Sequence, residues 1–496
     1  MTRDISSLPL VALTRIFNSL NAHNRLTASL VCKKWLQIID CPPLLCDVEI
    51  QFSGKIKEAL NLFSCMTRRF QWFSFHRVVI KGPVVEFLMK YDEQFGTLSF
   101  IDCKIGKSKC KSKIQGRILH CHNLKTLDVQ NSNVLFLFAS LFNVTTLKLH
   151  MSSGLSDYDM SELHESLCIL EKLTFGANVL CGEELCKIFY DEGELEEDPS
   201  DRFLTFWKYK NVNRKNRNTL THVSFTCSNL SAEAVLTISK IEGLNLRSIS
   251  FPINLHSDYI TQFCENQLFL ASLDLSVSLH VTDDTVFAVC ECLPNLQELI
   301  IRSNQEIDPC IVEIFRLRNL VKLDLSRCLN ISYVTYVMAM SILETFKLKY
   351  LDMATTTIKD GQLFELLQRN PNIRFLNASD IRVSDKTLNM ICQNLTLLEC
   401  LILESCPTIS DSGLTGEFEN HSDSLSAIPL SNLKRLTELN LSQNNLITNE
   451  GCLKSIRFPE LEKLSLIACH GLILNNDFKR ELKKQNRCLR HFNTSV

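Results

Sequence analysis

Cysteine is the residue type of this 496-residue chain that could do most chemistry, and there are 22 of them. A thiolate can act as a nucleophile or bind a metal, and each role needs its own spacing and surroundings. Structural zinc sites use spaced pairs such as Cys-x2-Cys, and no set of such pairs occurs here. Cys290-Glu291-Cys292 has one intervening residue, and Cys121-His122 is an isolated pair. We therefore predict no metal site, no cofactor and no RING-type zinc module.

Motifs of other catalytic classes are also missing from the sequence. Glycine is scarce at 15 residues, and neither a glycine-rich phosphate loop nor a Gly-x-Ser-x-Gly turn occurs. A cysteine–histidine nucleophilic site stays open as an alternative, because its members need only meet in the fold. Cys264, Cys290 and Cys392 fall within apolar helical patterns, where a packing role explains them. We predict no catalytic residue and a protein that is not an enzyme.

Charge and apolar patterning favour neither nucleic acid nor membrane as a partner. The formal net charge is −2 and 22% of the residues are charged. No run of about 18 apolar residues is present, and the start MTRDISSLPL does not read as a signal peptide. We therefore expect reduced thiols and a cytoplasmic or nuclear location, or both. Residues 104–113 carry five lysines; a solvated loop is the favoured interpretation, and a nucleic-acid or phosphorylated partner is the alternative.

Short amphipathic helices are expected near the N-terminus, before Pro42-Pro43 stops them. The apolar residues at helical spacing are Leu8, Leu13, Ile16, Phe17 and Leu20, then Leu26, Leu30, Val31 and Trp35. About forty residues are too few to bury all of these side chains in a private core. Part of this apolar surface should therefore meet another chain.

The order of residues in this segment is more specific than its amphipathic pattern. It reads Leu8-Pro9, Ile16-Phe17, Leu20, Ser29-Leu30-Val31-Cys32-Lys33-Lys34-Trp35 and a proline-containing exit. This order resembles the F-box, although Leu10 and Val11 stand where family members often have an acidic residue. The resemblance implies a trihelical domain over residues 1–45 that docks on a Skp-family adaptor and, through it, on a cullin–RING core. The adaptor contacts that it implies are Leu8, Pro9, Ile16, Phe17, Leu20, Leu30, Val31 and Trp35.

The rest of the chain repeats the unit Leu-x-x-Leu-x-Leu-x-x-(Asn/Cys/Ser), whose places we number 1 to 9. The seventeen copies begin at Leu45, Phe75, Phe95, Leu124, Val144, Leu170, Leu220, Leu246, Leu270, Leu296, Leu320, Leu348, Ile373, Leu398, Leu436, Leu461 and Leu489. Positions 4 and 6 would point inward from a short strand, and the small polar side chain at position 9 would bond backbone groups of the turn. An apolar helical pattern precedes many of the strands. Asp283, Asp360, Asp385 and Asp411 lie near these helix starts, where a carboxylate meets free N–H groups.

This pattern resembles the cysteine-containing, helix-backed subclass of leucine-rich repeats. The resemblance implies an α/β fold in which the helical domain precedes a horseshoe over residues 46–496, with about 17 repeats, parallel strands on the concave side and helices on the convex side. Insertions interrupt the array near 183–218 and 415–432. For the first, a degenerate repeat with a solvated loop is favoured over a substrate-contact loop.

Outward strand positions on the concave side are where repeat proteins bind partners. Most of these positions are polar here, and the exceptions are Ile300, Tyr350, Phe375, Cys400 and Ile402. Cations near them are Arg302, Lys322, Lys349 and Arg374. We predict a substrate-binding patch made by Ile300, Arg302, Tyr350, Phe375 and Ile402, with sporadic exposed apolar residues as an equal alternative.

The two resemblances together imply the substrate-recognition subunit of an SCF (Skp–cullin–F-box) E3 ubiquitin ligase. Such a subunit recruits target proteins through its repeats for ubiquitination and proteasomal degradation. The alternative is a non-catalytic scaffold whose F-box acts outside ubiquitin transfer, and a further one is a repeat enzyme with a cysteine site. No motif names the target protein.

Overall fold

The computed structural model divides the chain into two compact units, Met1–Leu246 (unit 1) and Arg247–Val496 (unit 2). The residues it describes are 5, 8–54, 56–63, 65, 68–106, 119–138, 140–151, 167–177, 216, 218–225, 232–241, 243–252, 255–276, 280–342, 347–417 and 428–494. The predicted insertion at 183–218 lies outside these residues apart from Asn216 and Asn218, as do the middle of the insertion at 415–432 and most of the lysine run at 104–113.

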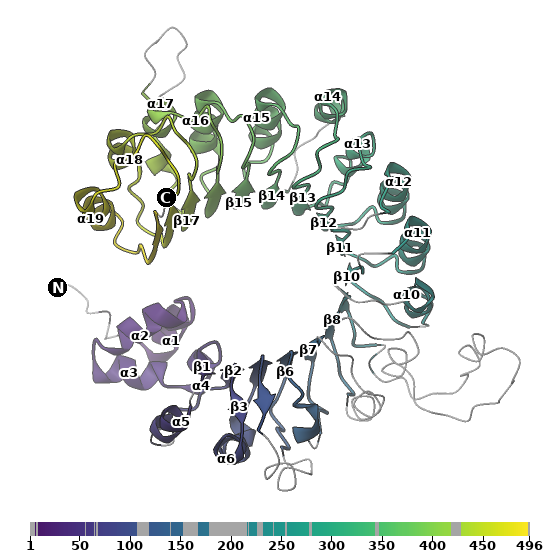
Figure 1. Ribbon diagram of the computed structural model, residues 1–496, viewed down its shortest axis with the longest axis vertical. Coiled ribbons are helices and arrows are strands. Elements are labelled where there is room, and N and C mark those ends of the chain that lie inside the picture. The colour runs from purple at the N-terminus through teal and green to yellow at the C-terminus, as the bar shows by residue number, and fades with distance from the viewer. Residues whose placement is uncertain are drawn as a thin grey trace, which may run out of the picture. The chain divides into compact units, whose positions relative to one another are not determined.

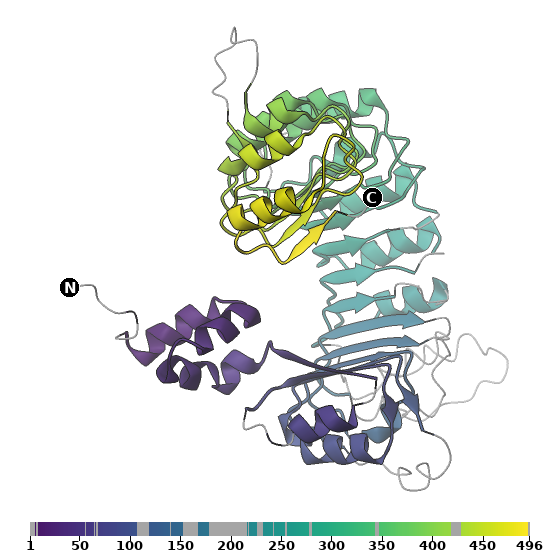
Figure 2. The same cartoon turned by 60° about the vertical axis from the view of Figure 1, so that its left-hand side comes forward.

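Unit 1 begins with four short helices that we call the N-terminal bundle. They are α1 (Leu10–Asn18), α2 (Ala22–Ser29), α3 (Lys33–Ile39) and α4 (Pro42–Leu45). Pro9 is the N-cap of α1, and the Asn21 side chain caps α2 by accepting a hydrogen bond from the Asn24 N–H at 2.8 Å. Pro42 and Pro43 end the run of α3 and also open α4, where the first helical positions need no N–H donor. Figure 2 shows these helices as a bundle of their own before β1.

Seven parallel strands follow among the described residues of unit 1, each paired in register with the next. They are β1 (Glu49–Ser53), β2 (Trp72–His76), β4 (Thr97–Ile101), β6 (Thr126–Gln130), β7 (Thr146–Met151), β8 (Lys172–Ala177) and β9 (His222–Ser224). The other elements are α5 (Lys57–Phe63), α6 (Gly82–Lys90), α10 (Ala232–Ser239), the 3-10 turns Asp92–Gln94 and Leu135–Leu137, and the short pair β3 (Val79–Ile80) and β5 (Lys104–Ile105). The core is rich in phenylalanine: the Phe75 ring stacks on Phe52 and Phe100 of the flanking strands, each at 5.3 Å between centroids.

Among its described residues unit 2 contains ten parallel strands, each three residues long, and each of β10 to β18 is followed on the outer side by a helix (Figure 1). The strands are β10 (Ser248–Ser250), β11 (Ser272–Asp274), β12 (Glu298–Ile300), β13 (Lys322–Asp324), β14 (Tyr350–Asp352), β15 (Phe375–Asn377), β16 (Cys400–Ile402), β17 (Glu438–Asn440), β18 (Lys463–Ser465) and β19 (His491–Asn493). The helices are α11 (Ser257–Asn266), α12 (Asp283–Cys292), α13 (Ile311–Ile314), α14 (Tyr333–Ile342), α15 (Asp360–Gln368), α16 (Asp385–Asn394), α17 (Asp411–Thr415), α18 (Asn449–Ser455) and α19 (Asn476–Gln485), with a 3-10 turn at Leu430–Asn432. The predicted α/β class, a helical bundle followed by helix-backed parallel strands, is confirmed.

Position 9 of the repeat satisfies a backbone group in five coils of unit 2, as its polar residues predicted. The thiols of Cys328, Cys406 and Cys469 donate to the backbone oxygen at position 6 of the preceding coil, at 2.9, 3.3 and 3.2 Å. Asn304 and Asn444 do the same with their amides, at 3.2 and 2.7 Å. Cysteine and asparagine are therefore interchangeable here because both present a donor to the same buried carbonyl.

The aspartates at the helix starts bind the next coil rather than only their own helix. The Asp385 carboxylate accepts from the Ser410 backbone N–H at 2.8 Å and from its hydroxyl at 2.5 Å. Asp411 repeats the arrangement with Thr448, at 2.8 and 2.6 Å. Gly451 must be small, since a Cβ there would overlap the Asp411 carboxylate. These contacts join successive coils, a role that the helix-dipole argument did not predict.

The first two repeat copies begin elsewhere than the sequence pattern indicated. In β1 the residues paired with the inward Phe73 and Phe75 are Ile50 and Phe52, so the copy assigned to Leu45 starts two residues later. In β2 the inward residues are Phe73 and Phe75 themselves, so the copy assigned to Phe75 starts five residues earlier. In β1 the shift of two residues keeps the same alternation of apolar side chains, whereas the shift of five in β2 changes it, and pairing with the neighbouring strand decides both starts. Among the described residues, no helix is long and apolar enough to cross a membrane.

Candidate protein-binding surfaces

The N-terminal bundle has a small core that fixes the positions of its surface residues. The core consists of Leu13, Phe17, Ala28, Ile38, Ile39 and Leu44, with Leu8, Leu20 and Trp35 packed partly against it. The Phe17 and Trp35 rings meet edge to face at 5.1 Å between centroids. Arg25 is 3% exposed, donates to the Leu20 backbone oxygen at 2.6 Å and forms an ion pair with Asp47.

The bundle leaves several large apolar side chains in contact with solvent. Leu30 is 82% exposed and Val31 61%, at the turn between α2 and α3. Leu10 and Val11, in the first turn of α1, are 60% and 66% exposed. Leu26 of α2 is half exposed. A monomeric protein gains nothing by exposing so many aliphatic groups on about forty residues, so this surface has the chemistry of a protein interface.

The strand face of unit 2 carries two rows of outward side chains, at positions 3 and 5 of the coils. At position 3 the cross-strand register brings Lys322, Tyr350, Phe375 and Cys400 together on β13 to β16. The Tyr350 and Phe375 rings stack in parallel at 4.1 Å between centroids, and the Lys322 ammonium lies 4.9 Å from the Tyr350 centroid. This row therefore presents a cation and two aromatic rings side by side.

The second row, at position 5, is polar and internally bonded over β13 to β15. Asp324, which is 1% exposed, accepts from the Arg302 guanidinium at 2.6 Å and from the Ser326 hydroxyl at 2.6 Å. Asp352 on the next strand accepts from the Asn377 amide at 3.1 Å. Burial, with the neighbouring Asp324 charge, raises the pKa of Asp352, and the hydrogen bond to Asp324 raises that of Arg302.

The predicted concave-face residues are brought together only in part. Tyr350 and Phe375 are adjacent, and Ile402 lies on the strand that follows Phe375, paired with Asn377. Ile300 lies on β12 and pairs with Asp324, so β13 separates it from the aromatic pair. Arg302 is held by Asp324. The apolar part of the face is therefore Tyr350, Phe375 and Ile402, and their binding role stays a prediction.

A family model provides an independent assignment for the front of the chain. The F-box domain model matches residues 5–47, the same residues that form the N-terminal bundle and its exit. Residues 5–47 are an F-box domain.

Comparisons of the whole chain with known proteins find a solved structure of similar fold but no curated relative. No curated protein matches the sequence. Among solved structures, the chain is similar to one from the crystal structure of the Rad7 and Elc1 complex in yeast, with 15% identity and a TM-score of 0.52 over 69% of this chain and 80% of that one. It also matches an internalin (inlF) from Listeria monocytogenes, with 14% identity and a TM-score of 0.27 over 90% of this chain and 94% of that one. The first likeness shows a shared fold, and the second is too weak to carry an argument.

The predicted adaptor contacts of the F-box separate into exposed and buried residues. Pro9, Ile16, Leu30 and Val31 are exposed, whereas Leu8, Leu20 and Trp35 are half-buried against the core. Phe17 is 1% exposed and therefore holds the helices in place. Sequence reasoning missed Leu10, Val11 and Leu26 as surface residues. For Val11 the available signal was helical periodicity, which places it on the opposite side of α1 from Leu13 and Phe17. Leu10 has the spacing of the buried face, three and seven residues before these two, and is nevertheless exposed in the first turn.

Several buried cysteines have a raised thiol pKa, which makes them poor candidates for nucleophiles. Burial raises the pKa of Cys121, Cys290, Cys392 and Cys406 to about 12, and that of Cys328 to about 11. The thiols at these positions are therefore protonated at neutral pH, whereas a nucleophile requires the thiolate. Among the described residues, no group of three or more His, Cys, Asp or Glu side chains is placed to hold a metal ion.

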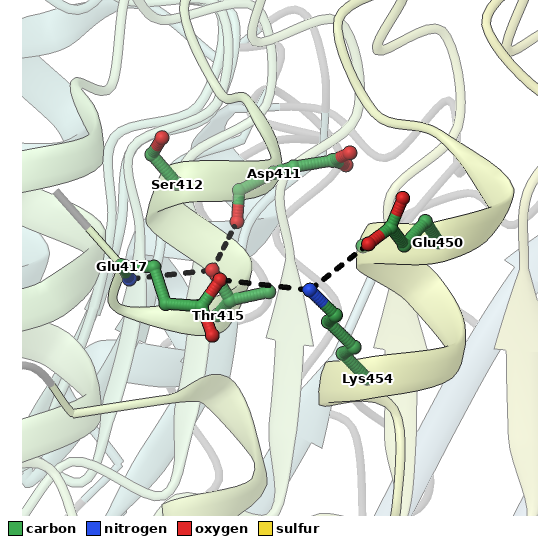
Figure 3. Close-up of a pocket in the computed structure, with 7 residues that line it drawn as sticks. Asp411, Ser412, Thr415, Glu417, Glu450 and Lys454 are labelled. Atoms are coloured by element: carbon green, nitrogen blue, oxygen red, sulfur yellow. Dashed lines mark hydrogen bonds and ion pairs between the residues drawn. The ribbon is translucent and has the colours of Figure 1, made fainter. Parts of the chain in front are cut away.

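A polar pocket of about 340 Å³ lies between α17 and α18 on the helical side of unit 2 (Figure 3). Lys454 bridges Glu450 at 2.9 Å and Glu417 at 3.7 Å, and the Thr415 hydroxyl donates to the Asp411 backbone oxygen at 2.9 Å. The Glu450 contact raises the pKa of the Lys454 ammonium. Because Lys454 pairs with both glutamates and the Asp411 carboxylate accepts from the Thr448 hydroxyl, this pocket is explained by packing between the two helices.

Proposed function

We propose that this protein is the substrate-recognition subunit of an SCF E3 ubiquitin ligase. In this role the F-box docks on a Skp-family adaptor that is bound to a cullin–RING core, and the repeats hold a target protein for ubiquitination and proteasomal degradation. The protein forms no bond itself; it raises the effective concentration of the target lysine near the conjugating enzyme. It acts in the cytoplasm, the nucleus or both.

The observation that carries the proposal is the exposed apolar surface of a domain matched by the F-box model. The side chains of Leu30 and Val31 are mostly exposed and therefore do not belong to the core of the domain. Leu10 and Val11 add two more exposed aliphatic side chains to the same domain. The fold neighbour Rad7 is itself recorded in a complex with Elc1, which is compatible with a repeat protein of this fold working in an assembly. The raised thiol pKa values disfavour the cysteine-enzyme alternative.

The test is co-purification of the full chain with a recombinant Skp-family adaptor. The variant Leu30→Ser/Val31→Ser changes exposed side chains only, so we expect it to fold and to lose the complex. A matched control is Leu62→Ser/Met89→Ser, which alters two exposed apolar residues of α5 and α6 outside the F-box, at 73% and 50% exposure. Phe17→Ala is unsuitable as a surface variant, because it empties the core of the domain.

Each outcome of this test has a defined meaning. A one-to-one complex that the control retains and the F-box variant loses supports the adaptor interface. Addition of the cullin–RING core and ubiquitin, followed by analysis of proteins captured on the repeats, then tests the ligase role. Absence of any complex with the wild-type chain contradicts the proposal. A complex that never promotes ubiquitination of a captured protein favours the scaffold alternative.

A further inference from the structure

One pocket on unit 2 is lined by cations without carboxylates. It has a volume of about 270 Å³ and is lined by Val321, Lys347, Lys349, Asn372, Arg374 and Leu397. Three of these six residues are cations and none is a carboxylate. The pocket between α17 and α18, in contrast, contains three carboxylates beside its one lysine.

The backbone ladder places the pocket directly beside the aromatic pair. The Lys349 N–H donates to the Val321 oxygen at 2.8 Å, and the Arg374 N–H donates to the Lys349 oxygen at 2.8 Å. Val321, Lys349 and Arg374 are therefore at position 2 of three successive coils. Tyr350 and Phe375 occupy the next position of the last two coils. The pocket therefore adjoins the two strands that carry the stacked rings, and we call the pocket and the ring pair together the cationic–aromatic site.

The positive charge of this site is only partly neutralised within the structure. Arg374 forms an ion pair with Glu399 at 3.1 Å, and both side chains are nearly half exposed. Lys347 and Lys349 are exposed and have no carboxylate within ion-pair distance among the described residues. Two unneutralised ammonium groups above the half-buried Val321 and Leu397 side chains favour a ligand with an anionic end and an apolar neighbour.

We infer that the cationic–aromatic site binds a segment of a partner protein that carries an acidic or phosphorylated side chain next to an apolar one. The anionic group enters the pocket between Lys347, Lys349 and Arg374. The adjacent apolar side chain packs on the exposed edges of the Tyr350 and Phe375 rings. The bound segment defines the class of target protein for the proposed function. Only the ubiquitination of the bound partner, and not its binding, rests on that function.

The experiment presents immobilised full-length protein with four peptide pools of identical length and random flanks. The fixed central residue is glutamate, phosphoserine, serine or lysine. We expect the glutamate or phosphoserine pool to be retained above the serine and lysine pools, with Leu, Ile, Phe or Tyr enriched beside the fixed residue. Retention of the phosphoserine pool alone identifies a phosphorylated partner, and retention of both identifies an acidic one. Equal retention of all pools, or of none, overturns the inference.

Two matched charge variants locate the binding. Lys347→Gln/Lys349→Gln should lower retention of the anionic pools roughly fivefold or more, since each exposed charge contact is worth up to about 1 kcal/mol. Lys483→Gln/Lys484→Gln removes the same charge from α19 and should leave retention unchanged. An equal loss in both variants means non-specific attraction and overturns the site assignment. Circular dichroism checks that each variant is folded.

The failure of this inference and that of the proposed function are distinguishable. Peptide retention is measured without an adaptor, and Lys347 and Lys349 lie in unit 2, outside the F-box. The Lys347→Gln/Lys349→Gln variant should therefore co-purify with the adaptor as the wild type does. Loss of adaptor binding with retained peptide binding would leave the cationic–aromatic site intact and remove only the ligase role.

Discussion

The F-box and the strand face of unit 2 are both candidate protein-binding surfaces, but they expose opposite chemistry. The F-box presents aliphatic side chains such as Leu30 and Val31 to water, and a partner that covers them lowers the free energy by removing this apolar surface from water. The strand face is mostly satisfied when empty, because Arg302 pairs with Asp324 and Asn377 bonds Asp352. An apolar surface that is exposed in the free protein suits a permanent complex, whereas a polar surface whose groups are already hydrogen-bonded suits transient complexes.

The same contrast extends to the residues that support each surface. The F-box depends on one small core in which Phe17 and Trp35 meet, so a single side chain decides whether the surface exists. Unit 2 has a repeated core in which each coil contacts its neighbours through equivalent bonds, such as those of Asp385 and Asp411. A repeated core limits the effect of one change to adjacent coils.

Phe17→Ala should have the largest effect. The ring is 1% exposed in a core of six buried residues, so its loss should cost about 3–5 kcal/mol and unfold the F-box while unit 2 stays folded. Hydrogen exchange, compared between α1–α3 and β10–β19, measures the effect in both regions. Adaptor binding should disappear with the protection of α1. Full protection of α1 in the variant would contradict the assignment of Phe17 to a structural role.

The F-box illustrates how far sequence alone reaches. The order of its residues predicts the family and the helices, because the motif combines many positions at fixed spacing. It does not separate buried from exposed members: Phe17 and Leu30 both appear as apolar motif residues, yet one is 1% and the other 82% exposed. That distinction depends on how α1, α2 and α3 pack, which the spacing along one helix does not determine.

The strand face shows a different limit. The repeat register predicts which side chains point outward, including Tyr350 and Phe375. It fails at the first two copies, where several Phe, Val and Ile residues allow more than one start and only pairing with the next strand decides. Lys347, which lines the cationic–aromatic site, precedes position 1 of its repeat, so the repeat pattern does not identify it.

Asp324→Ala should have an intermediate effect, confined to unit 2. The change leaves the Ser326 N–H and hydroxyl, both within a buried residue, without their acceptor, and frees Arg302. We expect a loss of about 1–3 kcal/mol in the free energy of unfolding, measured by denaturant titration.

Asp284→Ala is the matched control, since this exposed carboxylate in the first turn of α12 should change stability by no more than about 0.5 kcal/mol. If Asp324→Ala is as mild as its control, the row at position 5 is not the internally satisfied surface described above, and the contrast with the F-box weakens.

The smallest effect should be a pH dependence at Asp352. Burial first, and then the neighbouring Asp324 charge, raise the pKa of this carboxyl in the folded protein. The folded state then holds the proton more tightly than the unfolded chain, whose Asp pKa is about 3.9. The contribution of Asp352 to stability is therefore most favourable below about pH 4 and declines as the pH rises through the raised folded pKa. Asp352→Asn removes this slope, so the stability of the wild type relative to the variant should fall over that window and be constant above it. Unfolding titrations from pH 4 to pH 7 on both proteins measure this difference in the free energy of unfolding. A difference that does not change with pH would contradict the raised pKa of Asp352.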